Sequence, residues 1–595
     1  MKSGICATVL LASAFLGLGS MTGCTQPNQT AQTAQTASTP TTAESSQPDP
    51  SILKLLYSRA PVTLNPHLAT GYQDFEAARI VYEPLASYNA KGELIPFLAA
   101  EIPTAANGGV AKDGKSVTWK LRPGVAWSDG KLFTADDVVF TFQFIRNPQV
   151  AAATAQFYEG VKSVEAVDKQ TVKITFAEPT AAWSIPFTGQ TGVVLPKHVF
   201  EKFNNFQARS AQANVQPIGT GPYTVLAFSP GKIIYNPNTT YWGGAPAFKS
   251  IELTGGIAPY AAARDVLRAG TADFANNIQV EASALKDLEK DAQGRLITTF
   301  GSNVERIMLN FSNPFAKTES GERSSPKVPH PYFSDIRVRE AINLAIDRDA
   351  IARELYGNAG KPTAQLLVEP AQYASANIPY EYNLNQAKAL LDAAGWVDTN
   401  KNGIRDKGGV EMEVLFQSAV NPVRQETQAI VKKSLEDLGM KVEVDRVRVD
   451  DFFSANPEQT NSLNHFYADM QVYSTGNESP DPITYMSWWT CAKIASQENK
   501  WQEPNNARYC NPEYDQLWQA AAKELDPQKR ADLFKQMDEL LAMDVAVIPI
   551  VHRAIANAVS NTLTGLEPTP WDASTWDIKN WKRSETTPGQ GENKS

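Results

Sequence analysis

Among the residues whose types and spacing could do chemistry, one segment matches the start of a calcium loop. Asp398–Gly403 places Asp, Asn and Asn at alternate positions before a glycine, and Asp406 extends the run. Side-chain oxygens at such positions can bind Ca²⁺, but a bidentate Glu must close the loop at its twelfth position. Gly409 stands at that position. We therefore favour a turn between a helix and a strand over a calcium site.

Three common catalytic motifs are absent. The five histidines are scattered and none forms His-Glu-x-x-His, a zinc-binding pattern. No Gly-x-Ser-x-Gly elbow presents a serine nucleophile. Gly357–Lys361 has the wrong glycine spacing for a phosphate-binding loop, and Pro362 follows where Ser or Thr is required. We expect no enzymatic activity and no cofactor.

Size and charge limit the class of protein further. The 595 residues, 42% of them hydrophobic, are enough for two or three domains. The formal net charge is −9 and the basic residues form no block. We therefore expect no nucleic-acid partner.

The N-terminal residues have the pattern of a secretory signal (residues 1–23) followed by a tether (residues 24–50). Lys2 is positive, and Val9–Leu18 is an apolar run of signal length, too short to span a membrane comfortably. Met21–Cys24 resembles a lipobox, with Met where Leu is usual, which implies a diacylglycerol on Cys24. Thr25–Pro50 lacks aromatic and large aliphatic residues, so it should be disordered. Cleavage and release without a lipid is the alternative.

The cysteines suggest one disulfide. Cys6 and Cys24 belong to the signal segment, which leaves Cys491 and Cys510 in the rest of the chain. An isolated pair in an exported protein favours a disulfide, which would contribute about 3 kcal/mol in the chain-entropy model. Two free buried thiols are the alternative.

Strands and helices alternate along the chain and must position these residues. Alternating apolar residues predict strands at Thr171–Phe176 and Val304–Phe311. Apolar residues at helical spacing predict helices at Asp335–Tyr356, ending at Gly357, and at Pro422–Leu438. This alternation indicates α/β lobes.

The longest motif, Trp119–Val138, joins a predicted strand to a predicted helix. It reads W-K-L-R-P-G-V-A-W-S-D-G-K-L-F-T-A-D-D-V, with Thr134 as the helix N-cap. The run resembles the signature of the family 5 solute-binding proteins, the dipeptide- and oligopeptide-binding components of ABC importers. Further matches extend over roughly residues 53–581, and they are Leu64–His67, Tyr82–Leu85, Gly219–Tyr223, Asp335–Ala341, Ala387–Leu391 and Gly395-Trp396.

The resemblance implies an α/β fold of the periplasmic-binding-protein type, with two lobes that close on a ligand. Lobe I would comprise residues 51–303 and 545–595, with an extra subdomain at about 96–216 that is expected of the large class. Lobe II would be residues 304–544. Two crossing strands, near Val304–Phe311 and near Val545–His552, would form the hinge.

The resemblance also implies a ligand site on lobe II. In the family, an Asp about four residues before a Pro binds a peptide ammonium, and a short strand before it pairs with the peptide backbone. Here Glu478 takes the place of that Asp, and Pro480 is an extra proline. A buried ammonium needs a carboxylate partner. The expected contacts are Ser474, Thr475, Gly476, Asn477 and Glu478, with Asp481 as the competing carboxylate. A solvated turn is the alternative.

Two further segments would face this site. The loop Thr70-Gly71-Tyr72 matches a loop that lies beside the ligand in the family. Gly71 would permit close backbone approach, and Tyr72 would pack on a ligand side chain. Arg424 is a candidate partner for a ligand carboxylate because a guanidinium binds bidentately, and an ordinary surface arginine is the equal alternative.

These features predict a lipid-anchored receptor on the periplasmic or extracellular face of the cell membrane. It would be a monomer that captures di- or oligopeptides and delivers them to an ABC transporter permease. A family member that binds another solute, such as a nickel chelate, haem, opine or oligosaccharide, is the first alternative. An exported hydrolase is the second, and no motif supports it.

Overall fold

The computed structural model describes residues 49–290 and 292–584. The predicted signal segment, Cys24 and the predicted tether up to residue 48 lie outside the described residues. Within the described ranges, no helix is both long enough and apolar enough to cross a bilayer.

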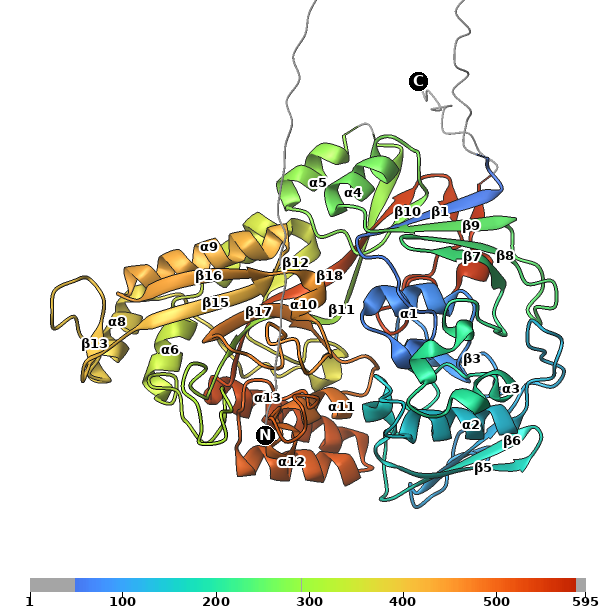
Figure 1. The fold of residues 1–595 in the computed structure, drawn as a ribbon, viewed down its shortest axis with the longest axis horizontal. Coiled ribbons are helices and arrows are strands. Elements are labelled where there is room, and N and C mark those ends of the chain that lie inside the picture. Colours follow the sequence, from blue (N-terminus) through green and yellow to red (C-terminus); the bar gives the residue numbers. More distant parts are fainter. Residues whose placement is uncertain (1–48, 291, 585–595) are drawn as a thin grey trace, which may run out of the picture. The chain divides into compact units, whose positions relative to one another are not determined.

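One mixed sheet runs through both halves of the fold (Figure 1). Its strand order is β16-β15-β17-β11-β18-β10-β1-β9-β8-β7, and β12 pairs with β18. The strands are β1 Ile52–Tyr57, β7 Tyr223–Ser229, β8 Lys232–Pro237, β9 Ser250–Gly255, β10 Phe274–Ala275, β11 Gly294–Leu309, β12 Gly360–Pro362, β15 Glu413–Ala419, β16 Lys441–Val447, β17 Met470–Thr475 and β18 Val547–Ser560.

Strands β11 and β18 connect the two halves. They pair antiparallel from Gly294 opposite Ser560 to Met308 opposite Val547, and the register shifts between Phe300 and Val304. On one side of this pair lie β1 and β7–β10, and on the other lie β15–β17. The structure thus confirms the predicted two-lobed α/β fold joined by two crossing strands.

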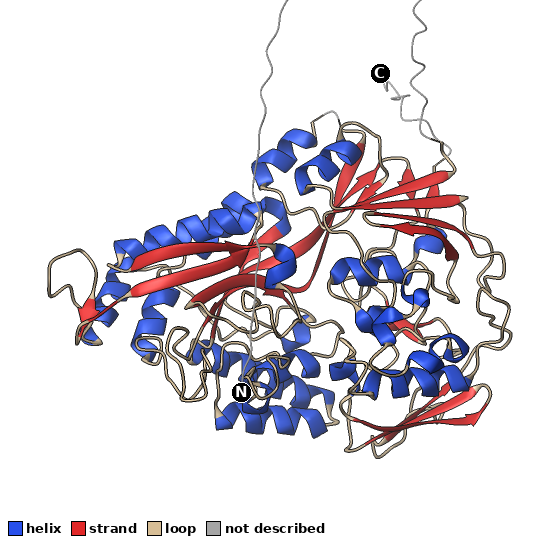
Figure 2. Cartoon of the chain, viewed as in Figure 1, coloured by secondary structure: helices blue, strands red, loops and turns tan. Residues whose placement is uncertain are grey.

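The remaining strands form small sheets, and helices pack on the large sheet (Figure 2). The small sheets contain β2 Ala86–Tyr88 with β3 Leu94–Pro96; β4 Ser116–Lys120, β5 Val161–Asp168 and β6 Thr171–Phe176; β13 Asp406–Lys407 with β14 Val410–Glu411; and β19 Leu563–Thr564 with β20 Lys582–Arg583. The α-helices are α1 Tyr72–Arg79, α2 Ala135–Arg146, α3 Lys197–Phe200, α4 Pro259–Leu267, α5 Ala282–Leu288, α6 Ile336–Leu344, α7 Arg348–Ile351, α8 Leu384–Ala393, α9 Pro422–Asp437, α10 Val449–Phe452, α11 Ile483–Met486, α12 Pro512–Lys523 and α13 Pro527–Met543.

Separate apolar cores stabilise the parts of the fold. One core draws its residues from Leu68 to Ala213 and includes the buried Trp119 and Trp127 of the long motif. It begins before residue 96, where the extra subdomain was expected to start. A second core joins β1 and β7–β9 to Trp581 near the C-terminus, so the two ends of the described chain meet in lobe I. Two further cores combine residues of the β15–β17 half with residues 545–551, at and just before the start of β18.

Local sequence accounts for several element boundaries. Strand β6 has the predicted bounds, and α2 begins with a capping box in which Thr134 and Asp137 satisfy each other's backbone N–H groups. Asn421 caps α9 through the N–H of Arg424, and Gly439, with φ 89°, follows its end.

The prediction of a single helix over Asp335–Tyr356 is wrong. Helix α6 ends at Leu344, and a new helix, α7, starts at Arg348 and continues into a π-helical turn, Ala352–Tyr356. The Asp347 side chain accepts the N–H of Ala350 at 2.9 Å. This local cap competes with continuation of α6, which apolar spacing alone does not reveal.

Candidate functional site

The predicted site residues lie where the two lobes meet beside the connecting strands. The Gln190 side chain of lobe I donates from Nε2 to Oε2 of Glu478 in lobe II at 2.9 Å. At the N-cap of α9, Asn421 Nδ2 donates to Gln279 Oε1 at 2.7 Å, again between the lobes. The two lobes are therefore in contact around Glu478 and around the start of α9.

Glu478 is accessible to solvent, and nearby protein nevertheless raises the pKa of its carboxyl. Its side chain is accessible to solvent, yet surrounding protein raises the pKa of its carboxyl above the ordinary value, with the Gln190 hydrogen bond acting in the opposite direction. Such a group is suited to exchange its water for a cationic ligand group.

The strand before Glu478 has an open edge. Strand β17 pairs with β11 over its whole length, Met470 to Thr475. It pairs with β15 only from Met470 to Val472. Among the described residues no strand continues the pairing at Tyr473–Thr475 on the β15 side. An extended ligand could add a strand there.

The segment after β17 is fixed to β11, and it leaves polar atoms unused. A Cβ on Gly476 would lie 2.3 Å from the Ser302 carbonyl oxygen, so glycine is required by packing. Ser302 Oγ donates to the Asn477 carbonyl at 2.7 Å. Among the described residues, the buried Ser474 Oγ, Asn477 Oδ1 and Gln190 Oε1 have no hydrogen-bond partner. Buried polar atoms without partners are costly, so these atoms favour a ligand or ordered water.

The loop Thr70-Gly71-Tyr72 is held by Asp74. Both the N–H and the hydroxyl of Thr70 donate to Asp74 Oδ2, at 2.7 and 3.0 Å. Gly71 has an extended backbone, and a Cβ there would meet side-chain atoms of Arg59 and Gln73 at 2.6 Å. Gly71 thus makes room for its own neighbours.

Tyr72 is the first residue of α1. Burial, followed by the charges of Glu76, Glu478 and Asp572, raises the pKa of its hydroxyl well above the ordinary value. Tyr72 is therefore electrostatically coupled to the predicted ammonium partner on the other lobe.

Arg424 is neither a surface arginine nor free for a ligand. Its side chain is 7% exposed, and Nε donates to Glu305 Oε1 at 2.7 Å. Glu305 lies opposite Ser474 in the β11–β17 pairing. Arg424, the residue predicted to bind a ligand carboxylate, is thus already paired with the carboxylate of Glu305.

Asp481 is also engaged. Its carboxylate pairs with the Arg530 guanidinium of α13, with Oδ1 accepting from Nη2 at 2.9 Å. The same oxygen accepts the N–H of Ile483 at 3.0 Å, at the start of α11. Asp481 therefore holds the segment after Glu478 in place.

Three residues of this region were missed by sequence reasoning: Gln190, Glu305 and Arg553. Gln190 lies in an ordinary-looking segment, Gln190–Gly192, that carries no signal. Glu305 and Arg553 are charged residues inside apolar strand sequences, and such residues mark functional positions more often than surface charges do.

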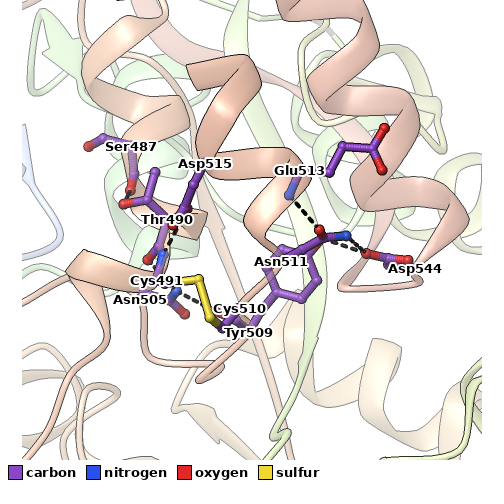
Figure 3. The surroundings of a disulfide bond; sticks show 10 residues. All are labelled: Ser487, Thr490, Cys491, Asn505, Tyr509, Cys510, Asn511, Glu513, Asp515 and Asp544. Atoms are coloured by element: carbon purple, nitrogen blue, oxygen red, sulfur yellow. Dashed lines mark hydrogen bonds between the residues drawn. A yellow bond between two sulfur atoms is a disulfide. The ribbon is translucent and has the colours of Figure 1, made fainter. Parts of the chain in front are cut away.

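The structure joins the sulfur atoms of Cys491 and Cys510 (Figure 3). Around them, Cys491 N–H donates to Asp515 Oδ1 at 3.0 Å, and Asn505 donates to the carbonyls of Thr490 and Tyr509. The enclosed segment carries Lys493, which forms an ion pair with Glu159 of lobe I at 2.7 Å. The linked segment thus contributes to the contact between lobes.

The calcium-like loop lies apart from this region. It borders an open hollow of about 890 Å³ in lobe II that Thr399, Asn400, Asp406 and Glu411 help to line. Glu411 accepts hydrogen bonds from Asn400 and Asn402. Within residues 49–290 and 292–584, no group of three or more His, Cys, Asp or Glu side chains is arranged to hold a metal ion.

Comparison with known proteins places the chain in a family. The sequence profile of the bacterial extracellular solute-binding proteins, family 5 middle, matches residues 64–497. The oligopeptide-binding protein AppA of Bacillus subtilis is 26% identical over 529 residues, covering 88% of this chain and 89% of the relative. The dipeptide-binding protein of Escherichia coli is 24% identical over 534 residues, covering 85% and 90%.

Solved structures share the fold. That of AppA from Bacillus subtilis with a nonapeptide has a TM-score of 0.74 at 23% identity, covering 90% of this chain and 99% of the other. That of NikZ from Campylobacter jejuni with Ni(L-His) has a TM-score of 0.75 at 21% identity, covering 90% and 100%. From the match over residues 64–497, the chain belongs to the bacterial extracellular solute-binding proteins of family 5.

Proposed function

We propose that this protein is a receptor that captures di- or oligopeptides outside the cytoplasm and delivers them to an ABC transporter permease, without chemical turnover. Relatives named as oligopeptide- and dipeptide-binding proteins support the solute class. We also propose that a lipid on Cys24 holds the receptor at the membrane surface and that Cys491 and Cys510 form a disulfide in the exported protein.

The observation that carries the peptide proposal is the environment of Glu478. Water reaches its carboxyl, nearby protein raises the pKa of that carboxyl, and within the described residues a single neutral side chain, Gln190, hydrogen-bonds to it. An ammonium brought to this carboxyl would favour its ionised form and form a charge-assisted hydrogen bond. A peptide N-terminus supplies such an ammonium.

The open edge at Tyr473–Thr475 supports the same solute class. A peptide whose ammonium binds Glu478 would lie next to that edge, and it could donate to and accept from the free backbone groups. The unpartnered Ser474 hydroxyl and Asn477 side-chain oxygen would find partners on the same backbone.

Calorimetry with the alanine peptides from dialanine to penta-alanine, each free and N-acetylated, tests this proposal. We expect binding of at least one free peptide, and a loss of about 2 kcal/mol or more on acetylation or on Glu478→Gln, because each removes one partner of an enclosed charge pair. The two losses should not add, as expected for partners in one interaction. The peptide recovered after binding should be intact.

Asp481→Asn is the matched control. It removes a neighbouring carboxylate that already pairs with Arg530, so it should weaken peptide binding less than Glu478→Gln does. Equal affinity for acetylated and free peptides would remove Glu478 as the ammonium partner. Absence of peptide binding, with another solute identified by mass spectrometry of the purified protein, would reject the peptide proposal.

A further inference from the structure

Arg553 of β18 carries a buried guanidinium without a carboxylate partner. The residue is 7% exposed and lies opposite Gly360 of β12. Nη1 donates to Asn277 Oδ1 at 2.9 Å. Among the described residues, Nε has no hydrogen-bond partner, and no Asp or Glu forms an ion pair with this arginine. A buried charge with so little compensation is costly.

The charged neighbours of Arg553 do not neutralise its positive charge. Burial and the nearby Arg424 charge lower the pKa of Arg553, whereas Glu305 raises it. Glu305 is already shared with Arg424 at 2.7 Å. Glu305 thus hydrogen-bonds to Arg424 and lies within electrostatic range of Arg553. The two guanidinium groups and the one carboxylate sum to a charge of about +1, because arginine does not lose its proton in proteins.

The position of this cluster connects it to the predicted site. Tyr72 of lobe I is close enough for its hydroxyl to influence Arg553, and the same hydroxyl is influenced by Glu478. Glu305 lies opposite Ser474 in the β11–β17 pairing. Arg553 and Glu478 are thus both within electrostatic range of Tyr72.

We propose that Arg553 receives the carboxylate of the bound solute, and that the Arg424–Glu305 pair serves as a neutral wall beside it. This assignment rests on the proposed peptide function and gives it a specificity: the receptor selects solutes with a free carboxylate. The anion would complete the hydrogen bonding of Arg553 and cancel the excess charge. Arg424, the candidate from the sequence, would act by fixing Glu305.

Calorimetry with the same alanine peptides as free acids and as C-terminal amides tests the assignment. In the unaltered protein we expect amidation to weaken binding at least tenfold. In Arg553→Gln the ratio between acid and amide should fall close to one. In the double variant Glu305→Gln/Arg424→Gln, which removes the internal pair and leaves Arg553, the ratio should stay at least tenfold.

Two further variants keep the test decisive. Arg553→Lys retains the charge without the planar fork, so it should keep part of the ratio, and Arg295→Gln, an exposed position on β11, should keep all of it. Melting curves identify variants that fail to fold. The assignment is overturned if folded Arg553→Gln or Arg553→Lys discriminates as the unaltered protein does, or if the double variant loses discrimination. Failure of every free-acid peptide to bind the unaltered protein would instead reject the proposed function.

Discussion

Glu76 gives a quantitative prediction, because it is a fully buried carboxyl in α1, one turn after Tyr72. It is 0% exposed, Oε1 accepts the N–H of Ser574 at 2.8 Å, and Oε2 accepts the Tyr57 hydroxyl at 3.3 Å. Burial raises the pKa of this carboxyl from 4.5 to about 7, and hydrogen bonds from Ser574, Tyr72 and Tyr57 offset only part of the rise.

The direction of the pH effect follows from proton uptake. Between pH 4.5 and 7 the folded protein keeps a proton on Glu76 that the unfolded chain has released. The stabilisation is therefore complete below pH 4.5 and is lost as the pH rises through about 7. Since one pKa unit corresponds to about 1.4 kcal/mol, the free energy of unfolding should fall by about 3 kcal/mol on this account by pH 8.

Glu76→Gln isolates this contribution. The amide oxygen can still accept the Ser574 N–H, and the group cannot ionise. In urea unfolding followed by tryptophan fluorescence, the variant should match the unaltered protein near pH 4 and exceed it by about 3 kcal/mol at pH 8. Other titrating groups change the stability of both proteins equally, so they cancel in the difference between the variant and the unaltered protein. One of them is the buried His67, whose pKa is lowered to about 4 and whose effect on stability has the opposite pH dependence. Glu178→Gln, at an exposed position, should show no such trend. A difference between Glu76→Gln and the unaltered protein that is the same at every pH would refute the reasoning.

Two further predictions concern the cysteines. Cys24→Ser should move the protein from the membrane to the soluble fraction, because an acyl chain contributes about 0.8 kcal/mol per buried methylene, and unchanged membrane association would count against the lipid anchor. Thiol titration of the denatured, unreduced Cys24→Ser protein, taken from the exported fraction after signal removal, should find no free thiol, whereas two titratable thiols would show that Cys491 and Cys510 remain reduced.

Local patterns were sufficient for elements whose ends are marked by caps. The alternation at Thr171–Phe176 and the helical spacing from Pro422, which Gly439 stops, are short-range signals, and the structure confirms a strand and a helix there. Apolar spacing alone does not predict the break after α6, because it does not register that Asp347 can cap a new helix.

The candidate site was predictable only on the side that the motif describes. Ser474–Glu478 follows from the family pattern, but Gln190, which contacts Glu478, is 288 residues away in the chain. The Arg424–Glu305 pair joins residues 119 apart. No local pattern encodes such contacts. The sequence therefore suggests a ligand-binding or a surface role for Arg424, whereas its partner in the structure is the buried Glu305.

The two strands that connect the lobes also carry charged side chains. Glu305 is on β11 and Arg553 is on β18, the two strands that run between the lobes, while Glu478 meets Gln190 of the opposite lobe. Without a solute, bringing the lobes together encloses a carboxyl and an excess guanidinium at the expense of their hydration. A zwitterionic solute would supply an ammonium for Glu478 and a carboxylate for Arg553. A solute that carries both charges would therefore favour the closed arrangement most. On this argument the receptor gains selectivity from enclosure itself, since a solute that lacks one charge leaves either Glu478 or Arg553 without a charged partner between the lobes.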